Sequence, residues 1–303
     1  MASAFHVYFG PEALSAPIEI RKIAPKDCVA ALREGWEDFL AMPTHAAFLG
    51  LFYGLGGIAL AGLSSFGNAL ELVFPFAAGF ALIGPFFAVG LYELSRRREA
   101  GLAASWRDAF SVFRSPALPS IFALGFFLFV IFAIWIGVAE FLYAQLYGPR
   151  APAAALPFLR DVLTTSRGWT LILAGGLIGF GFAALSLCIS VIAFPLMLDR
   201  DPGLAPAVVA SMRLARANPG TVALWGLIVA AALILGSLPL FIGLAIVMPV
   251  LGHATWRLYR RAVERDPAHE TPIVGGPDLV EAPALRPVWI SLDLQDFLRR
   301  KPK

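Results

Sequence analysis

The hydrophobic positions of the chain fall into six long apolar segments separated by shorter polar ones. Each is long enough, at helical rise, to cross the hydrocarbon core of a bilayer, which takes about 20 residues. We expect spans at about 44–63, 72–94, 119–142, 169–198, 220–237 and 240–259. The pattern therefore predicts an all-α, polytopic membrane protein with six transmembrane helices.

Three polar segments have the amphipathic pattern of a helix that lies on a membrane surface. In the first, which we expect to begin with Asp27 as its N-cap, apolar and charged residues take opposite faces. Its apolar face holds Val29, Leu32, Trp36, Phe39 and Leu40, and its charged face holds Arg33, Glu34, Glu37 and Asp38. The second sets Trp106, Phe110 and Phe113 against Arg107, Ser111 and Arg114. The third, 204–217, sets Val208, Met212 and Ala215 against Arg213 and Arg216. We expect a solvated face to account for the carboxylates of the first helix.

The chain contains an internal repeat. Segments 79–97 and 243–261 align at one constant offset, which pairs Pro85 with Pro249 and the two double arginines with each other, Arg96 and Arg97 with Arg260 and Arg261. Each amphipathic helix ends at a proline and precedes two spans, so three hairpin units are expected; the middle one matches only in pattern. We therefore divide the chain into an irregular N-terminus (1–26), a membrane domain (27–261) and a tail (262–303). Segment 143–167 is the longest expected loop.

Composition supports the membrane class, and charge placement gives an orientation. The chain is 58% hydrophobic and 15% charged, below the roughly 25% charged residues of soluble domains. Every Lys and Arg except Arg150, Arg160 and Arg167 lies on the side of the N-terminus. By the positive-inside rule both termini are cytoplasmic, and the net charge of +3 does not indicate nucleic acid as a partner.

The candidate chemistry is sparse. Glu93 precedes Arg96 and Arg97 by one helical turn. It is either a proton or substrate site or a snorkelling cap that pairs with these arginines. Its place at the membrane edge favours the snorkelling cap. His253 has too few companions for a metal or haem site, and the motifs of common enzymes are missing, so we expect no cofactor, no metal and no catalysis. Pro85, Pro195 and Pro249 fall within spans, as transporter hinges or as fixed kinks.

Two sets of residues are candidates for contacts. Contacts with lipid or a partner are expected from Trp36, Glu93, Arg96, Arg97, Trp106, His253, Trp256, Arg257, Arg260 and Arg261. Close helix packing is expected at Gly50, Gly54, Gly175 and Gly179, because small residues let helices approach each other in a membrane.

Several short motifs resemble those of a bacterial family of predicted integral membrane proteins of unknown function. They are Gly-Trp-x-Asp-Phe at 35–39, Ala-Gly-Phe-x-Leu-Ile-Gly-Pro at 78–85, Gly-Leu-Tyr-Glu-Leu-Ser-Arg-Arg at 90–97, Asn-Pro at 218–219 and Gly-His-Ala-Thr-Trp-Arg-Leu-Tyr-Arg-Arg at 252–261. The resemblance covers about residues 20–262 and implies six helices in the bacterial inner membrane with no assigned activity. Some members are labelled as similar to cytochrome c oxidase subunit I, but this chain lacks the intramembrane histidines that its haems and copper require.

Two functions follow as alternatives. Glycine faces, surface helices and the lack of buried charge favour a non-catalytic accessory or scaffold protein that packs against another membrane complex or lipid. The repeats and mid-span prolines favour a transporter of an apolar or amphiphilic small molecule. A membrane enzyme is the third and least favoured class.

Overall fold

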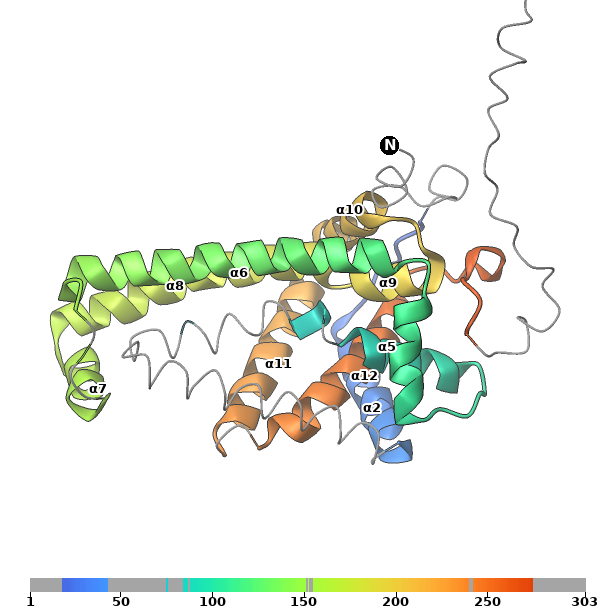
Figure 1. Ribbon diagram of the computed structural model, residues 1–303, viewed down its shortest axis with the longest axis horizontal. Coiled ribbons are helices and arrows are strands. Elements are labelled where there is room, and N and C mark those ends of the chain that lie inside the picture. Colours follow the sequence, from blue (N-terminus) through green and yellow to red (C-terminus); the bar gives the residue numbers. More distant parts are fainter. Residues whose placement is uncertain are drawn as a thin grey trace, which may run out of the picture. The chain divides into compact units, whose positions relative to one another are not determined.

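The computed structural model describes residues 18–42, 75, 84–86, 88–150, 152, 155–239 and 242–274. The chain forms two compact units, Met1–Thr271 and Pro272–Lys303, and the elements below belong to the first. Every regular element among the described residues is helical (Figure 1). They are α2 (Pro25–Ala41), α5 (Val89–Glu99), η2 (Trp106–Arg114), α6 (Leu118–Tyr147), α7 (Ala155–Thr164), α8 (Ser166–Ser190), α9 (Ala193–Arg200), α10 (Leu204–Ala217), α11 (Pro219–Ser237), α12 (Leu244–Ala262) and η3 (Pro267–His269).

Three helical segments of the described chain are long and apolar enough to cross a membrane. They are Leu118–Tyr147, Ser166–Arg200 and Pro219–Ser237, which correspond to the third, fourth and fifth predicted spans. The expected span at 44–63, most of that at 72–94, and Gly50 and Gly54 lie outside the described residues. The sixth expected span, 240–259, corresponds to α12, which is not among the three because its second half is polar and basic.

The fourth span was expected over about 169–198 with Pro195 as a hinge or a kink, and it is interrupted a few residues before that proline. The helix turns at Val191 and Ile192, between α8 and α9. The backbone N–H of Ile192 leaves the helix and donates to the hydroxyl of Ser211 on α10, at 3.2 Å. Pro195 has no N–H to give to a preceding carbonyl, so the local sequence also weakens the helix here.

Three local predictions are wrong in detail. Asp27 is not the N-cap of α2: Pro25 is the first helical residue, and the Asp27 carboxylate accepts the N–H of Ala24, at 2.7 Å, from within the first turn. The second amphipathic segment is a 3-10 helix, η2, that begins after Ser105. The expected loop 143–167 is partly helical, since α6 continues to Tyr147 and α7 occupies Ala155–Thr164.

The helices α5, α9 and α12 contact one another, and each carries a second helix on its side. α2 packs along α12, η2 along α5, and α10 along α9 and the end of α8. Each of these three contacts, which we call joints, centres on a small residue of the surface helix. Gly35 lies against Ala254, Ala109 against Gly90, and Ser211 against Ile192. A Cβ on Gly35 would lie 2.6 Å from the backbone nitrogen of Ala254, so α2 can approach α12 this closely only with glycine.

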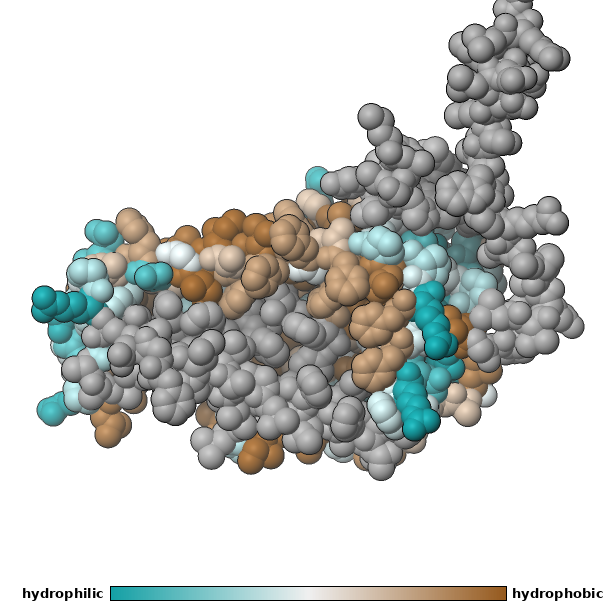
Figure 2. Space-filling view, in the orientation of Figure 1, coloured by the Kyte–Doolittle hydropathy of each residue, from teal (hydrophilic) through white to brown (hydrophobic). Residues whose placement is uncertain are grey.

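The paired helices α6 and α8 are covered by exposed apolar side chains. Gly179 on α8 lies close to the ring of Trp135 on α6, and a Cβ on Gly175 would lie 3.6 Å from the side chain of Leu142, also on α6. Exposed aromatic and aliphatic residues are distributed along both helices. They include Phe126, Phe141, Leu173, Leu177 and Phe180. Figure 2 shows this hydrophobic surface along α6, with polar residues toward its two ends. Such a surface is the one expected of helices in contact with lipid.

Candidate functional site: a buried ion-pair collar

Charged side chains gather where α5, α9 and α12 meet and where α2 packs on α12. We call this set the collar. It consists of the carboxylates Asp38, Glu93, Glu99 and Asp199 and the arginines Arg96, Arg97, Arg98, Arg257 and Arg260. The local cause is the helical period: residues three or four apart on the ends of α5 and α12 face the same neighbour.

Asp38 of α2 is the centre of one half of the collar. Its side chain is only 1% exposed. Arg257 donates to both carboxylate oxygens, at 2.9 and 2.8 Å, and Arg98 donates to one of them. The hydroxyl of Ser95 donates to Oδ2, at 3.0 Å. Asp38 is therefore not a solvated carboxylate, as its sequence context predicted, but a buried link between α2, α5 and α12.

His253 of α12 extends this half by one step. Its Nδ1 lies 2.7 Å from the hydroxyl of Ser95. A carboxylate can only accept hydrogen bonds, so the hydroxyl of Ser95 donates its hydrogen bond to Asp38. The Ser95 oxygen is then the acceptor toward His253, and Nδ1 of His253 must be the donor. In the neutral imidazole this leaves Nε2 as an acceptor, and that atom is buried with no hydrogen-bond partner among the described residues.

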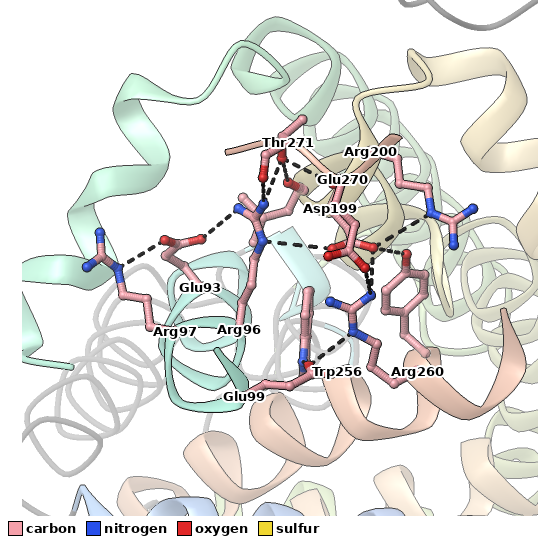
Figure 3. Close-up of polar contacts among 12 residues, drawn as sticks. Glu93, Arg96, Arg97, Glu99, Asp199, Arg200, Trp256, Arg260, Glu270 and Thr271 are labelled. Atoms are coloured by element: carbon pink, nitrogen blue, oxygen red, sulfur yellow. Dashed lines mark hydrogen bonds and ion pairs between the residues drawn. The ribbon is translucent and has the colours of Figure 1, made fainter. Parts of the chain in front are cut away.

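Asp199 of α9 is the centre of the other half, which Figure 3 shows. Its side chain is fully buried. Oδ2 accepts from the hydroxyl of Tyr259, at 2.6 Å, and from Arg260, at 2.9 Å. Arg96 of α5 approaches Oδ1 to 3.8 Å. One carboxylate thus joins the ends of α5, α9 and α12.

Arg260 connects this half to the aromatic residues of α12. It donates to Glu99 at 3.0 Å and to Glu270 at 3.2 Å. Its guanidinium also lies over the ring of Trp256, 4.7 Å from the centroid, while the indole N–H of Trp256 donates to Glu99 at 2.8 Å. Trp256 is therefore an interior residue that holds Arg260 in place.

Glu93 makes the ion pairs that its spacing predicts, but its surroundings differ from the prediction. Arg97 donates to it at 3.1 Å and Arg96 at 3.4 Å. Ser111 of η2 donates to it at 3.3 Å, and Arg97 reaches Asp108 of the same helix at 3.3 Å. The Glu93 side chain is 3% exposed, so it is packed inside the protein and does not extend to water as a snorkelling cap would.

The structure divides the predicted contact residues into two groups. Trp36 and Trp106 are on the outer sides of α2 and η2. The others lie in or beside the collar, with Arg261 paired to Glu34 of α2. The expectation that charge is not buried is wrong, because the partners of Asp38 and Asp199 lie far away in the sequence. A hint was available for Asp199, which directly ends a long apolar run.

The carboxylates of the collar are paired within the protein. Among the described residues, no group of three or more His, Cys, Asp and Glu side chains is placed to hold a metal ion. The carboxylates Asp38, Glu93 and Asp199 each face at least two arginines. Groups that are paired in this way hold helices together at fixed positions, and removing one partner leaves a costly unpaired charge.

Comparison with known proteins identifies a family model that matches part of the chain. Residues 73–199 match the family model described as "Predicted integral membrane protein (DUF2189)", which confirms the resemblance over this stretch. The matched stretch includes Glu93, Arg96, Arg97 and Asp199 but neither α2 nor α12. No curated protein and no solved structure matches the chain.

Proposed function

We propose, from the premise that this is a predicted integral membrane protein, that it is a non-catalytic accessory or scaffold component of the bacterial inner membrane. In this proposal the chain has six spans in three hairpin units, with both termini cytoplasmic. The three candidate spans and the three joints support the arrangement, since each surface helix precedes a hairpin and packs on the second helix of another. The collar then lies at the cytoplasmic ends of the spans.

The observation that carries the proposal is the paired state of the collar. A site that binds and releases an ion or a polar substrate needs groups that can exchange partners. Here Asp38 is held by Arg257, Arg98 and Ser95, and Asp199 by Arg260, Arg96 and Tyr259. Such a network fixes the helix ends relative to one another and leaves the outer, apolar faces of the helices for contacts.

Purification tests this proposal. The chain is extracted in mild detergent at its native expression level, and every protein and lipid that remains with it is identified. A stoichiometric protein partner supports the scaffold role. A protein that is pure and alone, or that carries one defined small molecule, contradicts it.

A transporter of an apolar or amphiphilic small molecule is the second candidate. It is favoured by the interruption between α8 and α9, by Pro249 inside α12, and by the buried Nε2 of His253, which has no hydrogen-bond partner among the described residues. A Pro249→Ala variant discriminates the two. Loss of transport activity with normal insertion supports a transporter, whereas an unchanged level of co-purified partner protein supports a scaffold.

A further inference from the structure

The three joints share a feature that the collar does not use. In each surface helix the small residue that is buried at the joint is followed directly by a large apolar residue that is exposed. Gly35 is followed by Trp36, Ala109 by Phe110, and Ser211 by Met212. These three apolar side chains are 44%, 46% and 44% exposed. They therefore occupy the same place relative to three separate joints, one residue beyond the buried contact.

Each of the three residues belongs to a wider apolar face with a nearby arginine. Exposed apolar neighbours are Val29 and Leu40 on α2, Phe113 on η2 and Val209 on α10. The exposed arginines are Arg33, which pairs with Glu37 at the surface, Arg107, which lies over the ring of Trp106, and Arg213. Apolar side chains flanked by arginines are characteristic of a helix in the headgroup region of a membrane.

The connections to the spans favour lipid over water or a second protein as the occupant of these faces. η2 ends at Arg114, and the apolar helix α6 begins at Leu118. α10 ends at Ala217, and the apolar helix α11 begins at Pro219. A surface helix joined so closely to a span must lie where that span enters the bilayer.

We propose that Trp36, Phe110 and Met212 are three equivalent anchors that lie at the boundary between headgroups and acyl chains of one leaflet, with Arg33, Arg107 and Arg213 beside anionic headgroups. The proposal rests on the membrane placement given above but not on the scaffold role. Each anchor directly follows its joint residue in the sequence. The position of the anchor in the membrane therefore also determines the position of the collar helix that the joint holds.

Depth-dependent quenching tests the proposal on the full chain. The purified protein is reconstituted in phosphatidylcholine vesicles, with or without phosphatidylglycerol, that carry bromine high or low on the acyl chain. The difference between the native chain and its Trp36→Phe variant gives the signal of Trp36, and the variants Phe110→Trp and Met212→Trp report the other two positions. Glu37→Trp, next to Trp36 on α2 but turned away from the apolar face, is the matched control.

We expect all three positions to lose fluorescence to the bromine carried high on the chain, more than to the one carried low, and to resist iodide added to the water. The control should respond to iodide instead. Iodide quenching at any of the three positions, in a variant whose thermal unfolding matches that of the native chain, overturns the three-point anchor. No other protein is present in the vesicles, so a failure here is distinct from the absence of a partner on purification.

Discussion

Asp38 receives hydrogen bonds from three side chains on two other helices, and it lies almost entirely out of water. Asp38→Asn keeps the shape of the side chain but leaves Arg257 and Arg98 without their buried anion. We expect the variant to lose about 3–5 kcal/mol of stability, measured by thermal unfolding in detergent. Glu37→Gln, at an exposed pair in the same helix, should change stability by no more than about 0.5 kcal/mol. Equal losses in the two variants would contradict the assignment of Asp38 to the interior.

Glu270 gives the collar a dependence on pH. Burial alone would raise the pKa of Glu270, but the hydrogen bond from Arg265 and the positive charges of Arg260 and Arg265 lower it below its ordinary value. A carboxylate whose pKa is lower in the folded state stabilises the fold above its unfolded pKa, about 4.3, and loses that effect as pH falls through its folded pKa.

The Glu270→Gln variant measures this contribution. At pH 7 it should be less stable than the native chain, by about 1 kcal/mol or less, because Glu270 is only partly buried. The difference should shrink when both proteins are compared at an acidic pH below the folded pKa of Glu270, where this carboxyl is protonated in folded and unfolded chains alike. A difference that is the same at both pH values would show that the charge of Glu270 is not the cause.

At the scale of elements, the close approach of α2 to α12 depends on Gly35. In Gly35→Ala the new Cβ would meet backbone atoms of Ala254 at 2.6 and 2.8 Å, and backbone cannot move aside as a side chain can. We expect a loss of about 1–3 kcal/mol or more on thermal unfolding. Gly220→Ala in α11 is the control, because no atom of the described residues lies within 4 Å of the added Cβ, and it should be neutral or stabilising by up to about 1 kcal/mol. A stable Gly35→Ala protein would show that the helices lie further apart.

The sequence predicted the elements better than their faces. Apolar length identified the helices Leu118–Tyr147 and Pro219–Ser237, and prolines identified the ends of α2 and α10, because these signals are local. The face of α2 that is buried could not be read in this way. It carries Asp38, whose partner Arg257 is 219 residues away, so an amphipathic pattern places the carboxylate in water. At the break between α8 and α9, Pro195 indicated a hinge or kink, but Ser211, which binds Ile192, lies on another helix and could not be identified in the same way.

At the scale of the whole molecule, the length of α6 bears on the topology. Its 30 residues rise about 45 Å, more than the roughly 30 Å of a hydrocarbon core, so it reaches past the membrane interface. Tyr143 and Tyr147 stack near its far end, where Arg167 lies over the ring of Tyr147. Aromatic residues and a few cations at this end, against the arginine-rich collar at the other, agree with a collar on the cytoplasmic side.

Cysteine labelling tests that orientation. In a background with Cys28→Ala and Cys188→Ala, Arg150→Cys should react with a membrane-impermeant maleimide in intact cells, because it follows the far end of α6. Lys26→Cys, an exposed position at the start of α2, should react only after the cells are lysed. The reverse result would invert the proposed topology.

The joint between α2 and α12 also determines when the protein can finish folding during its synthesis. α2 leaves the ribosome long before α12, since Arg257 follows Asp38 by 219 residues. At about 5–20 residues per second, Asp38 waits roughly 10–40 seconds for Arg257, and Gly35 about as long for Ala254, while the intervening helices insert. A nascent chain halted before Leu244 therefore leaves Asp38 without Arg257 and leaves the surface around Gly35 uncovered by α12. We expect quality-control proteases to remove such a chain faster than the complete protein, which pulse-chase labelling would measure; equal lifetimes would mean that the membrane domain is stable before this joint closes.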